Sequence, residues 1–455
     1  MKHKSIKDFT KGSIPKALFW FMLPFMFSNA LQVLYTTIDM WIVGRYVGTA
    51  GLSAVSQASQ LVNFAAFVCV GISNAGQILI AQAIGGGKKE KITRILSTLF
   101  YIVMTLSVIF SAVFLLFGND LLQILKMPSE SIGMGAEYLS VCGGGIFFTA
   151  AYQMISAVLR GMGDSTRPLI FILIASVTNL VLDILFTGIL GWGVLGAAWA
   201  TVIGQAVSVL FSVYYLSKHK ADFGFDFRKE NLRMEKAYAG MILRLGTPMA
   251  IQSGVINISM LFVSSIVNGV GVVASATFGV GLRIDDIVNK ISLGIQYAVV
   301  PMVSQNIGAG ENHRARKVVH WSLLFSIVFT AFCMALYGGF GKELFMIFSD
   351  DTAVHNMSGT FIKGILWLFP ALSVMRGTSG FIQGIGNARL GMVLSMLDAV
   401  VLRIGLSWLF GIGLGMGFYG AVLGYALAPY GVATPGLIYF LSGRWEKRKT
   451  LAEAL

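Results

Sequence analysis

The sequence predicts an all-α polytopic membrane protein with twelve transmembrane helices in two six-helix bundles. Of its 455 residues, 56% are hydrophobic and only 12% are charged, which is about half the share of charge found in soluble domains. The apolar residues form runs of about 20–28, long enough for a helix to cross about 30 Å of hydrocarbon. The second half of the chain also repeats the first, which indicates two similar bundles.

The predicted spans follow one another with short breaks. Glycine-rich or charged stretches separate the apolar runs, and the only long polar interruption lies between Lys218 and Lys236. The expected spans are 15–43, 51–82, 92–117, 133–159, 168–190, 193–217, 239–267, 272–303, 317–340, 357–382, 389–411 and 417–441.

The two halves align with an offset of 223 or 224 residues. Gly71 corresponds to Gly294, and Pro24 corresponds to Pro248. Six spans per copy is an even number, so both copies enter the membrane in the same sense, as a parallel pseudo-two-fold repeat. Two such halves enclose a central cleft suited to alternating access. The predicted domains are an N-terminal lobe at 1–217, a cytoplasmic linker at 218–238 and a C-terminal lobe at 239–455.

The net charge of +13 indicates membrane orientation rather than nucleic-acid binding. Of the 34 Lys and Arg, 26 lie in the loops of one side and four in the loops of the other. This positive-inside bias predicts that both termini are cytoplasmic. We therefore expect a multi-pass protein of the cell membrane whose surroundings are the lipid bilayer. No nucleic-acid partner is expected, and a monomer is sufficient.

The fifth predicted span carries a polar stripe with a carboxylate near its middle. Ser176, Asn179, Asp183 and Thr187 share one helix face, and the residues between them are mostly apolar. An ionised carboxylate at this depth costs at least about 2.5–3.5 kcal/mol. A cation, a proton or a partner side chain must offset that cost, so the stripe predicts a functional site.

Two other spans carry matching oxygen-rich stripes. One face of the first span presents Asn29, Gln32, Thr36 and Asp39, and one face of the sixth presents Thr201, Gln205, Ser208 and Ser212. Three such stripes, two with an acid, predict a shared polar cavity. The alternative is three separate stripes, each satisfied by ordinary hydrogen bonds between helices. When the two halves are aligned, the residue that corresponds to Asp39 is Phe262 or Val263, which is not acidic. The acidic cluster therefore belongs to the first half alone.

These motifs resemble the multidrug and toxic compound extrusion (MATE) family over nearly the whole chain. The resemblance rests on four motifs. They are Asp39-Met-Trp-Ile-Val-Gly44-Arg45, Ile84-Gly85-Gly86-Gly87, Arg160-Gly161-Met-Gly163-Asp164, and Asn179-x3-Asp183 followed by Gly191-Trp-Gly193-Val-Leu-Gly196 and Thr201. The glycine motifs are weak individually, whereas Asp39, Asn179, Asp183 and Thr201 in this order are specific.

The resemblance implies two six-helix lobes around a V-shaped central cleft, and secondary active export of organic, often cationic or amphipathic, drugs and toxins. Inward flow of H⁺ or Na⁺ would drive the export. The residues implied as the cation or proton site are Asp39, Asn179, Asp183 and Thr201. Further candidates for lining the cavity are Asn29, Gln32, Tyr35, Thr36, Gln205, Gln252 and Asn257. The seventh span lacks the acid of NorM-type members, which makes the chain more DinF-like.

Other ionisable residues in the spans are expected to pair with one another. Arg283, Asp286 and Lys290 lie along one helix face, where neighbours three or four residues apart interact. Asp398 and Arg403 are a second candidate pair, with Arg376 able to contribute. The alternative is that these groups line the cleft and gate it. Pro24 lies within the first span and predicts a kink or hinge.

Two other functions remain open from the sequence. The first is a flippase for a lipid-linked precursor, which would keep the fold and would need several basic residues in the cleft. The second is a membrane-embedded enzyme. The spans hold no metal-ligand cluster, no nucleophile–histidine pairing and no phosphate-binding loop. We therefore expect no enzymatic activity, no metal site and no cofactor other than the coupling ion.

Overall fold

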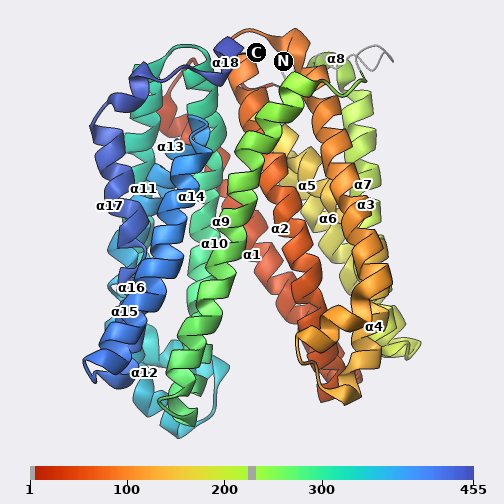
Figure 1. Cartoon of the computed structure of the whole chain (residues 1–455), viewed down its shortest axis with the longest axis vertical. Coiled ribbons are helices and arrows are strands. Elements are labelled where there is room, and N and C mark those ends of the chain that lie inside the picture. Colours follow the sequence, from red (N-terminus) through yellow and green to blue (C-terminus); the bar gives the residue numbers. More distant parts are fainter. Residues whose placement is uncertain (1–5, 224–231, 455) are drawn as a thin grey trace. The chain divides into compact units, whose positions relative to one another are not determined.

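The regular structure of the chain is helical throughout the described residues. A computed structural model describes residues 6–223 and 232–454, and every element in them is a helix (Figure 1). Within these two ranges, ten helices are long and apolar enough to span a membrane, and two bent helix pairs bring the number to twelve if each pair is one span. The predicted all-α class is confirmed.

The first half contains the predicted spans one to six. Its elements are α1 (Ile14–Tyr46), α2 (Thr49–Gly85), η1 (Lys89–Lys91), α3 (Ile92–Ile124), α4 (Ser129–Gly144), α5 (Ile146–Gly161), α6 (Thr166–Asp183), η2 (Ile184–Ile189), α7 (Gly193–Lys218) and α8 (Lys220–Phe223). Within these, η2 is a π-helix that continues α6.

The second half repeats this order with more interruptions. Its elements are α9 (Lys236–Asn268), α10 (Val272–Gly308), α11 (Asn312–Phe348), α12 (Thr352–Ile365), α13 (Leu368–Gly384), α14 (Ala388–Met396), η3 (Leu397–Ile404), α15 (Gly405–Trp408), η4 (Leu409–Gly413), α16 (Gly417–Leu427), α17 (Tyr430–Leu441), η5 (Arg444–Lys447) and α18 (Leu451–Ala454). Both η3 and η4 are π-helices.

Two predicted spans are broken rather than continuous. The span predicted at 133–159 forms α4 and α5, which are bent by 47°, and the span predicted at 357–382 forms α12 and α13, bent by 47°. The first break lies at Gly145, after two further glycines. Glycine loses more conformational entropy than any other residue on entering a helix, so the helix is least stable there. The second precedes Pro370, which cannot donate a backbone hydrogen bond to Leu366.

The helices group into two compact units whose boundaries differ from the predicted domains. Of the described residues, unit 1 contains 6–8 and those within Phe27–Ala250, and unit 2 contains Phe9–Met26 and Ile251–Ala454. The first helix of each half therefore begins in the unit formed mainly by the other half. The crossover points follow Pro24 and Pro248, the two prolines that the repeat aligns. Packing thus divides the chain inside α1 and α9, and the repeat boundary at 218–238 stays a prediction.

Repeated glycines allow these crossing helices to approach closely. A Cβ atom on Gly71 would lie 2.6 Å from the backbone nitrogen of Ala250, and one on Gly294 would lie 2.6 Å from that of Met26. These distances are too short for real Cβ contacts, so a side chain at either position would push the helices apart. The aligned glycines therefore have equivalent packing roles, one in each unit.

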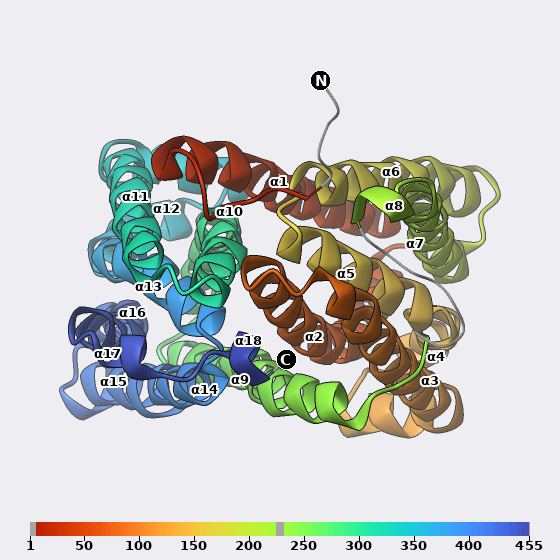
Figure 2. The same ribbon diagram turned by 90° about the horizontal axis from the view of Figure 1, so that it is seen from above.

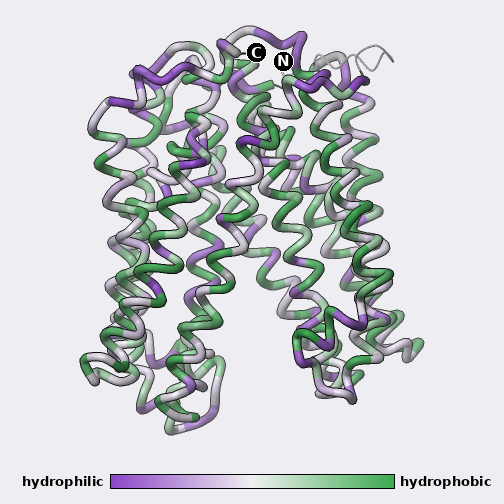
Figure 3. Tube along the Cα trace, in the orientation of Figure 1, coloured by the Kyte–Doolittle hydropathy of each residue, from purple (hydrophilic) through white to green (hydrophobic). Residues whose placement is uncertain are grey.

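Each unit has its own apolar core, and large apolar side chains also cover the outside. In unit 1 the core gathers around Val55, Leu139 and Ile146, whereas Trp41 is 65% exposed. The helices of each unit run side by side (Figure 2). Hydrophobic residues dominate the helices, and hydrophilic residues gather in the connecting segments (Figure 3). Apolar residues on both faces are typical of helices surrounded by lipid.

Candidate functional site

The predicted acid pair lies in unit 1, where α1, α6 and α7 contribute to one polar cluster. The Asp183 carboxyl, only 1% exposed, is next to the Asp39 carboxyl of α1. Asn179 lies one turn before Asp183 on α6 and is 2% exposed. The structure thus brings together two acids that are 144 residues apart in the chain (positions 39 and 183). Two carboxylates this close repel each other unless a proton or a cation lies with them.

Thr201 joins the cluster from α7. Asn179 Nδ2 donates a hydrogen bond to Thr201 Oγ1 at 3.4 Å, and the Thr201 hydroxyl donates to the carbonyl of Ala197 at 2.9 Å. The Tyr35 hydroxyl of α1 is also next to Thr201 and the two acids. All four residues of the predicted ion site therefore belong to one cluster.

Close packing of α6 against α7 sets these positions. A Cβ on Gly204 would lie 2.9 Å from the carbonyl oxygen of Ala175 and 3.1 Å from Cβ of Asn179. Ser208 reinforces the contact by donating to the Phe171 carbonyl at 2.9 Å. The glycine on α7 thus lets the backbone carrying Thr201 approach the α6 face that carries Asn179.

Several buried oxygens of this cluster make no hydrogen bond. They are Asp39 Oδ1, Asn179 Oδ1, both carboxyl oxygens of Asp183, and Oε1 of Gln205, one turn after Thr201 on α7. Buried polar atoms are normally hydrogen-bonded, and leaving one unsatisfied costs about 1–3 kcal/mol. Carboxylate, amide and hydroxyl oxygens are ligands suited to a hard monovalent cation, and the same acids can take up a proton. The donor set therefore fits either coupling ion.

Two residues of α4 belong to the same neighbourhood, although the sequence stripes did not include them. Tyr138 and Cys142 are buried and lie within electrostatic reach of Asp39. The Cys142 thiol also contacts the Ala198 carbonyl on α7, with the sulfur 3.8 Å from the oxygen. Their spacing of four residues places them on one helix face, which was the available signal.

The remaining polar residues predicted to line a cavity are in varied settings. Gln32 and Thr36 are exposed, and the Thr36 hydroxyl donates to its own helix, to the Gln32 carbonyl at 3.0 Å. Asn29 is half-buried. In unit 2, Gln252 Nε2 donates to Ser395 Oγ at 2.6 Å, and the side chain of Asn257 lies outside the described residues. A lining role for this set stays a prediction.

The predicted ion pairs are formed in part. Lys290 pairs with Asp286 at 2.8 Å, and Arg403 pairs with Asp398 at 3.0 Å. Arg283 is exposed and has no ion-pair partner among the described residues, because Asp286 reaches Lys290 instead. The expectation that Arg283 belongs to this pair is therefore wrong.

Arg376 also differs from its expected role. It is 4% exposed, and its guanidinium donates to Ser292 Oγ at 2.9 Å and to the side-chain and backbone oxygens of Asn289. Its hydrogen-bond partners are thus neutral oxygens rather than Asp398.

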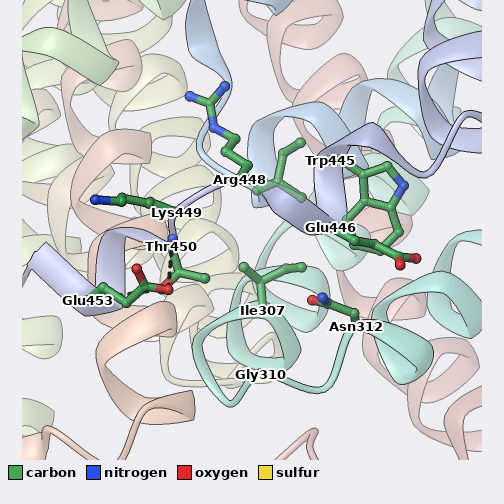
Figure 4. Close-up of a pocket in the computed structure, with 10 residues that line it drawn as sticks. Ile307, Gly310, Asn312, Trp445, Glu446, Arg448, Lys449, Thr450 and Glu453 are labelled. Atoms are coloured by element: carbon green, nitrogen blue, oxygen red, sulfur yellow. Dashed lines mark hydrogen bonds between the residues drawn. The ribbon is translucent and has the colours of Figure 1, made fainter.

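A pocket of about 150 Å³ lies elsewhere, at the C-terminal segment of unit 2 (Figure 4). Its lining residues are Ile307, Gly310, Asn312, Ile385, Trp445, Glu446, Arg448, Lys449, Thr450 and Glu453. Glu446 is paired with Arg316 at 2.5 Å, and the Thr450 hydroxyl donates to Glu453 at 3.2 Å. None of the predicted ion-site residues contributes to this pocket.

Comparisons with known proteins converge on one family. The MatE family model matches residues 24–185 and 248–409, so one model matches each half. The "Probable multidrug resistance protein YpnP" of Bacillus subtilis is 30% identical over 448 residues, 98% of this chain and 99% of the relative. The "Probable multidrug resistance protein NorM" of Thermotoga maritima is 26% identical over 461 residues, 99% of this chain and 98% of the relative.

Solved structures share the fold. A crystal structure of "MATE in complex with MaL6" superimposes with a TM-score of 0.92 at 21% identity, covering 98% of this chain and all of the other. The "Outward-facing conformation of a multidrug resistance MATE family transporter of the MOP superfamily" gives 0.91 at 21% identity, covering 99% of each chain. The two-lobe architecture predicted from the repeat is therefore that of known transporters.

Proposed function

Since the chain belongs to the MatE family of multidrug transporters, we propose that it exports organic cations and amphipathic compounds in exchange for H⁺ or Na⁺. The coupling ion binds at Asp39, Asn179, Asp183 and Thr201. The observation that carries this proposal is the group of buried oxygens without hydrogen-bond partners around the two acids. A proton or a monovalent cation among these oxygens would satisfy them and relieve the repulsion between the carboxylates.

Exchange follows from competition for the same negative charge. With both acids ionised, this part of unit 1 attracts a cationic substrate. Loading one ion lowers the negative charge by one and weakens that attraction. Substrate is then released on the outer side, where the ion enters. Either H⁺ or Na⁺ satisfies this scheme, because the donor set includes two carboxylates, an amide and a hydroxyl.

Alternating access requires helices that bend, and the crossover helices provide candidates. Pro24 of α1 and Pro248 of α9 each lie two residues before the point where the helix passes from one unit to the other. Each proline removes one backbone hydrogen bond from its helix. We infer that Pro24 is a hinge that changes how Asp39 meets Asp183, with Pro248 as its repeat counterpart.

The membrane orientation is part of the same proposal. The loop excess of Lys and Arg on one side supports cytoplasmic termini, and the plasma membrane is the expected location. The substrates are small molecules, and one copy of the chain holds all proposed ion ligands. A DinF-like assignment stays a prediction that rests on the seventh span.

The flippase alternative has less support. Binding a lipid-linked diphosphate would need free basic groups within the spans. Arg403 is paired with Asp398, and Arg376 is buried on neutral oxygens. Lys290 is paired with Asp286. Arg283 is the exception, exposed and without an ion-pair partner among the described residues. A diphosphate would need several such groups, so the contacts as a set favour export of cationic or amphipathic compounds.

Direct binding tests the competition. The affinity of purified protein in lipid nanodiscs for a fluorescent cationic dye would be measured while pH is lowered, and separately while Na⁺ is raised. We expect one ion to weaken dye binding to the wild type and to have much less effect on Asp183→Asn. Asp120→Asn, which changes an exposed acid on α3, is the matched control. Equal sensitivity of wild type and Asp183→Asn would reject this ion site.

A further inference from the structure

Unit 2 contains a second set of buried charges, for which the proposed exchange provides no role. Asp285 on α10 is 2% exposed, and Asp398 and Arg403 on η3 are 3% and 8% exposed. Charged side chains at this depth are costly and usually mark a functional pathway. The repeat aligns none of them with Asp39 or Asp183, so this cluster is not a copy of the first site.

A π-helix makes the Asp398–Arg403 pair possible. The two residues are five positions apart, a spacing that an α-helix turns by about 140°, away from a common face. In η3 (Leu397–Ile404) the wider turn brings them together, and Arg403 Nη2 reaches both carboxylate oxygens of Asp398, at 3.1 and 3.0 Å. The offset of the repeat aligns η2 with η4, so η3 belongs to the second half alone.

The Asp398–Arg403 pair is linked to Asp285 through Tyr425. The Arg403 guanidinium lies over the Tyr425 ring, 5.2 Å from its centroid, within the range of a cation–π contact. The Tyr425 hydroxyl donates to Asp285 Oδ2 at 2.7 Å. Asp398, Arg403, Tyr425 and Asp285 therefore form a continuous buried chain through η3, α16 and α10.

Asp285 itself is incompletely satisfied. Its Oδ1 is buried and makes no hydrogen bond, and no Lys or Arg lies within ion-pair distance of it in the described part of the chain. The charged and titratable groups around it are Tyr425, Arg403, Arg376, Tyr337 and, on its own helix, Asp286. Asp286 is exposed and paired with Lys290. Tyr337 contributes a buried hydroxyl that also lacks a hydrogen-bond partner.

We propose that Asp285 is a second proton-binding site, separate from the Asp39–Asp183 pair, and that the proton resides on Oδ1. A buried carboxylate with a single hydrogen bond and no cation in contact is unfavourable. A proton taken from the aqueous phase forms an O–H bond at Oδ1 and neutralises the group. Oδ2 then becomes the carbonyl oxygen and keeps the hydrogen bond from Tyr425. The Tyr337 hydroxyl, which is buried without a hydrogen-bond partner and interacts electrostatically with Asp285, is a candidate acceptor for the new O–H.

Infrared difference spectroscopy of the full chain in lipid tests this site. The Asp39→Asn/Asp183→Asn background removes the first acid pair, so the two proposals are tested separately. As pH is raised, we expect a protonated-carboxyl C=O band to decrease. The same band is absent when Asp285→Asn is added and retained when the exposed control Asp286→Asn is added.

Tyr425→Phe provides a second readout that does not depend on replacing the acid. Loss of the tyrosine donor to Oδ2 shifts the C=O band to higher frequency, because that carbonyl loses its hydrogen bond. The proposal is overturned if no such band is present, if its amplitude does not change with pH, or if it survives Asp285→Asn. In each of these cases Asp285 is a fixed partner of Tyr425 rather than a proton site.

Discussion

Asn179 on α6 donates a hydrogen bond to Thr201 on α7, with Nδ2 3.4 Å from Oγ1. The bond is long, and the Thr201 hydroxyl uses its own proton on the Ala197 carbonyl. Thr201 therefore presents its oxygen lone pairs to the cluster, and Asn179 keeps its carbonyl oxygen unpartnered beside Asp183. Each side chain therefore offers an acceptor oxygen to the cluster, although Asn179 donates through its Nδ2, and an oxygen of this kind is what an ion ligand requires.

Thr201→Val tests whether that oxygen binds the coupling ion. Valine keeps the shape of threonine but removes the oxygen, whereas Thr201→Ser keeps the oxygen. One lost hydrogen-bonding or ligand contact corresponds to about 0.5–1.5 kcal/mol, a reduction of about two- to tenfold in ion affinity. We expect this reduction for Val and little change for Ser, measured as the ion concentration that displaces dye. Equal affinities for both variants would remove Thr201 from the ligand set.

Gly294→Ala is expected to destabilise the contact between α10 and α1. The added Cβ would lie 2.6 Å from the backbone nitrogen of Met26, and such overpacking costs about 1–3 kcal/mol. Gly279 on the same helix is exposed and has open space around it, so Gly279→Ala should be neutral or slightly stabilising. Thermal unfolding in detergent compares them, and equal midpoints for the two variants would contradict the packing role.

The Asp398–Arg403 pair predicts strong non-additivity. Replacing either partner alone leaves a buried charge unpaired and costs about 3–5 kcal/mol. In the double variant Asp398→Leu/Arg403→Leu no such charge remains, so we expect much of the loss to be recovered. A double-mutant cycle on unfolding midpoints measures this coupling. Additive effects of the two single changes would mean that the pair does not hold η3 in place.

Asp164, in the connection before α6 and outside the spans, carries a pH-dependent contribution to stability. Its Oδ1 accepts the backbone N–H groups of Thr166 and Arg167, both at 3.0 Å. Burial nevertheless raises the pKa of the Asp164 carboxyl above its usual value, despite these bonds and the nearby Arg167 and Lys7. The folded chain therefore binds this proton more tightly than the unfolded chain.

The sign of the pH effect follows from the raised pKa. The contribution of Asp164 to the free energy of unfolding is fully present below its unfolded pKa and decreases as pH rises through the folded pKa. Asp164→Asn keeps the turn and should remove this pH dependence. Asp164→Ala should remove it as well, and its stability should lie about 1 kcal/mol below that of Asp164→Asn at all pH values, since the helix start loses its acceptor. Identical pH profiles for wild type and Asp164→Asn would refute the assignment.

Much of the fold could be predicted from hydropathy and the repeat, because each span must be apolar and long enough for the bilayer. The breaks at Gly145 and before Pro370 were missed, because the hydropathy of an apolar run does not differ between a straight helix and one bent by 47°. The crossover of α1 and α9 between units was also missed. Gly71 and Gly294 make close helix contacts at the two crossover points. In the sequence these positions are visible only as two glycines that the repeat aligns.

The first-half acid cluster could be predicted because its residues share helix faces at regular α-helical spacing. The sequence did not place Tyr138 and Cys142 of α4 beside it, since contacts between helices are not encoded in one helix's periodicity. The Asp398–Arg403 pair was expected, but its five-residue spacing is explained only by the π-helix η3. The partner of Asp285, Tyr425, is 140 residues away along the chain, beyond any local pattern.

Efflux from proteoliposomes tests the central claim most directly. Vesicles containing wild type, Asp183→Asn or the control Asp120→Asn are loaded with a fluorescent cationic dye. A pH gradient or a Na⁺ gradient is then imposed separately. The account predicts that one inward gradient drives export by wild type and Asp120→Asn, and that Asp183→Asn loses it. Export by Asp183→Asn at the wild-type rate, or no export by wild type under either gradient, would contradict ion-coupled export through this site.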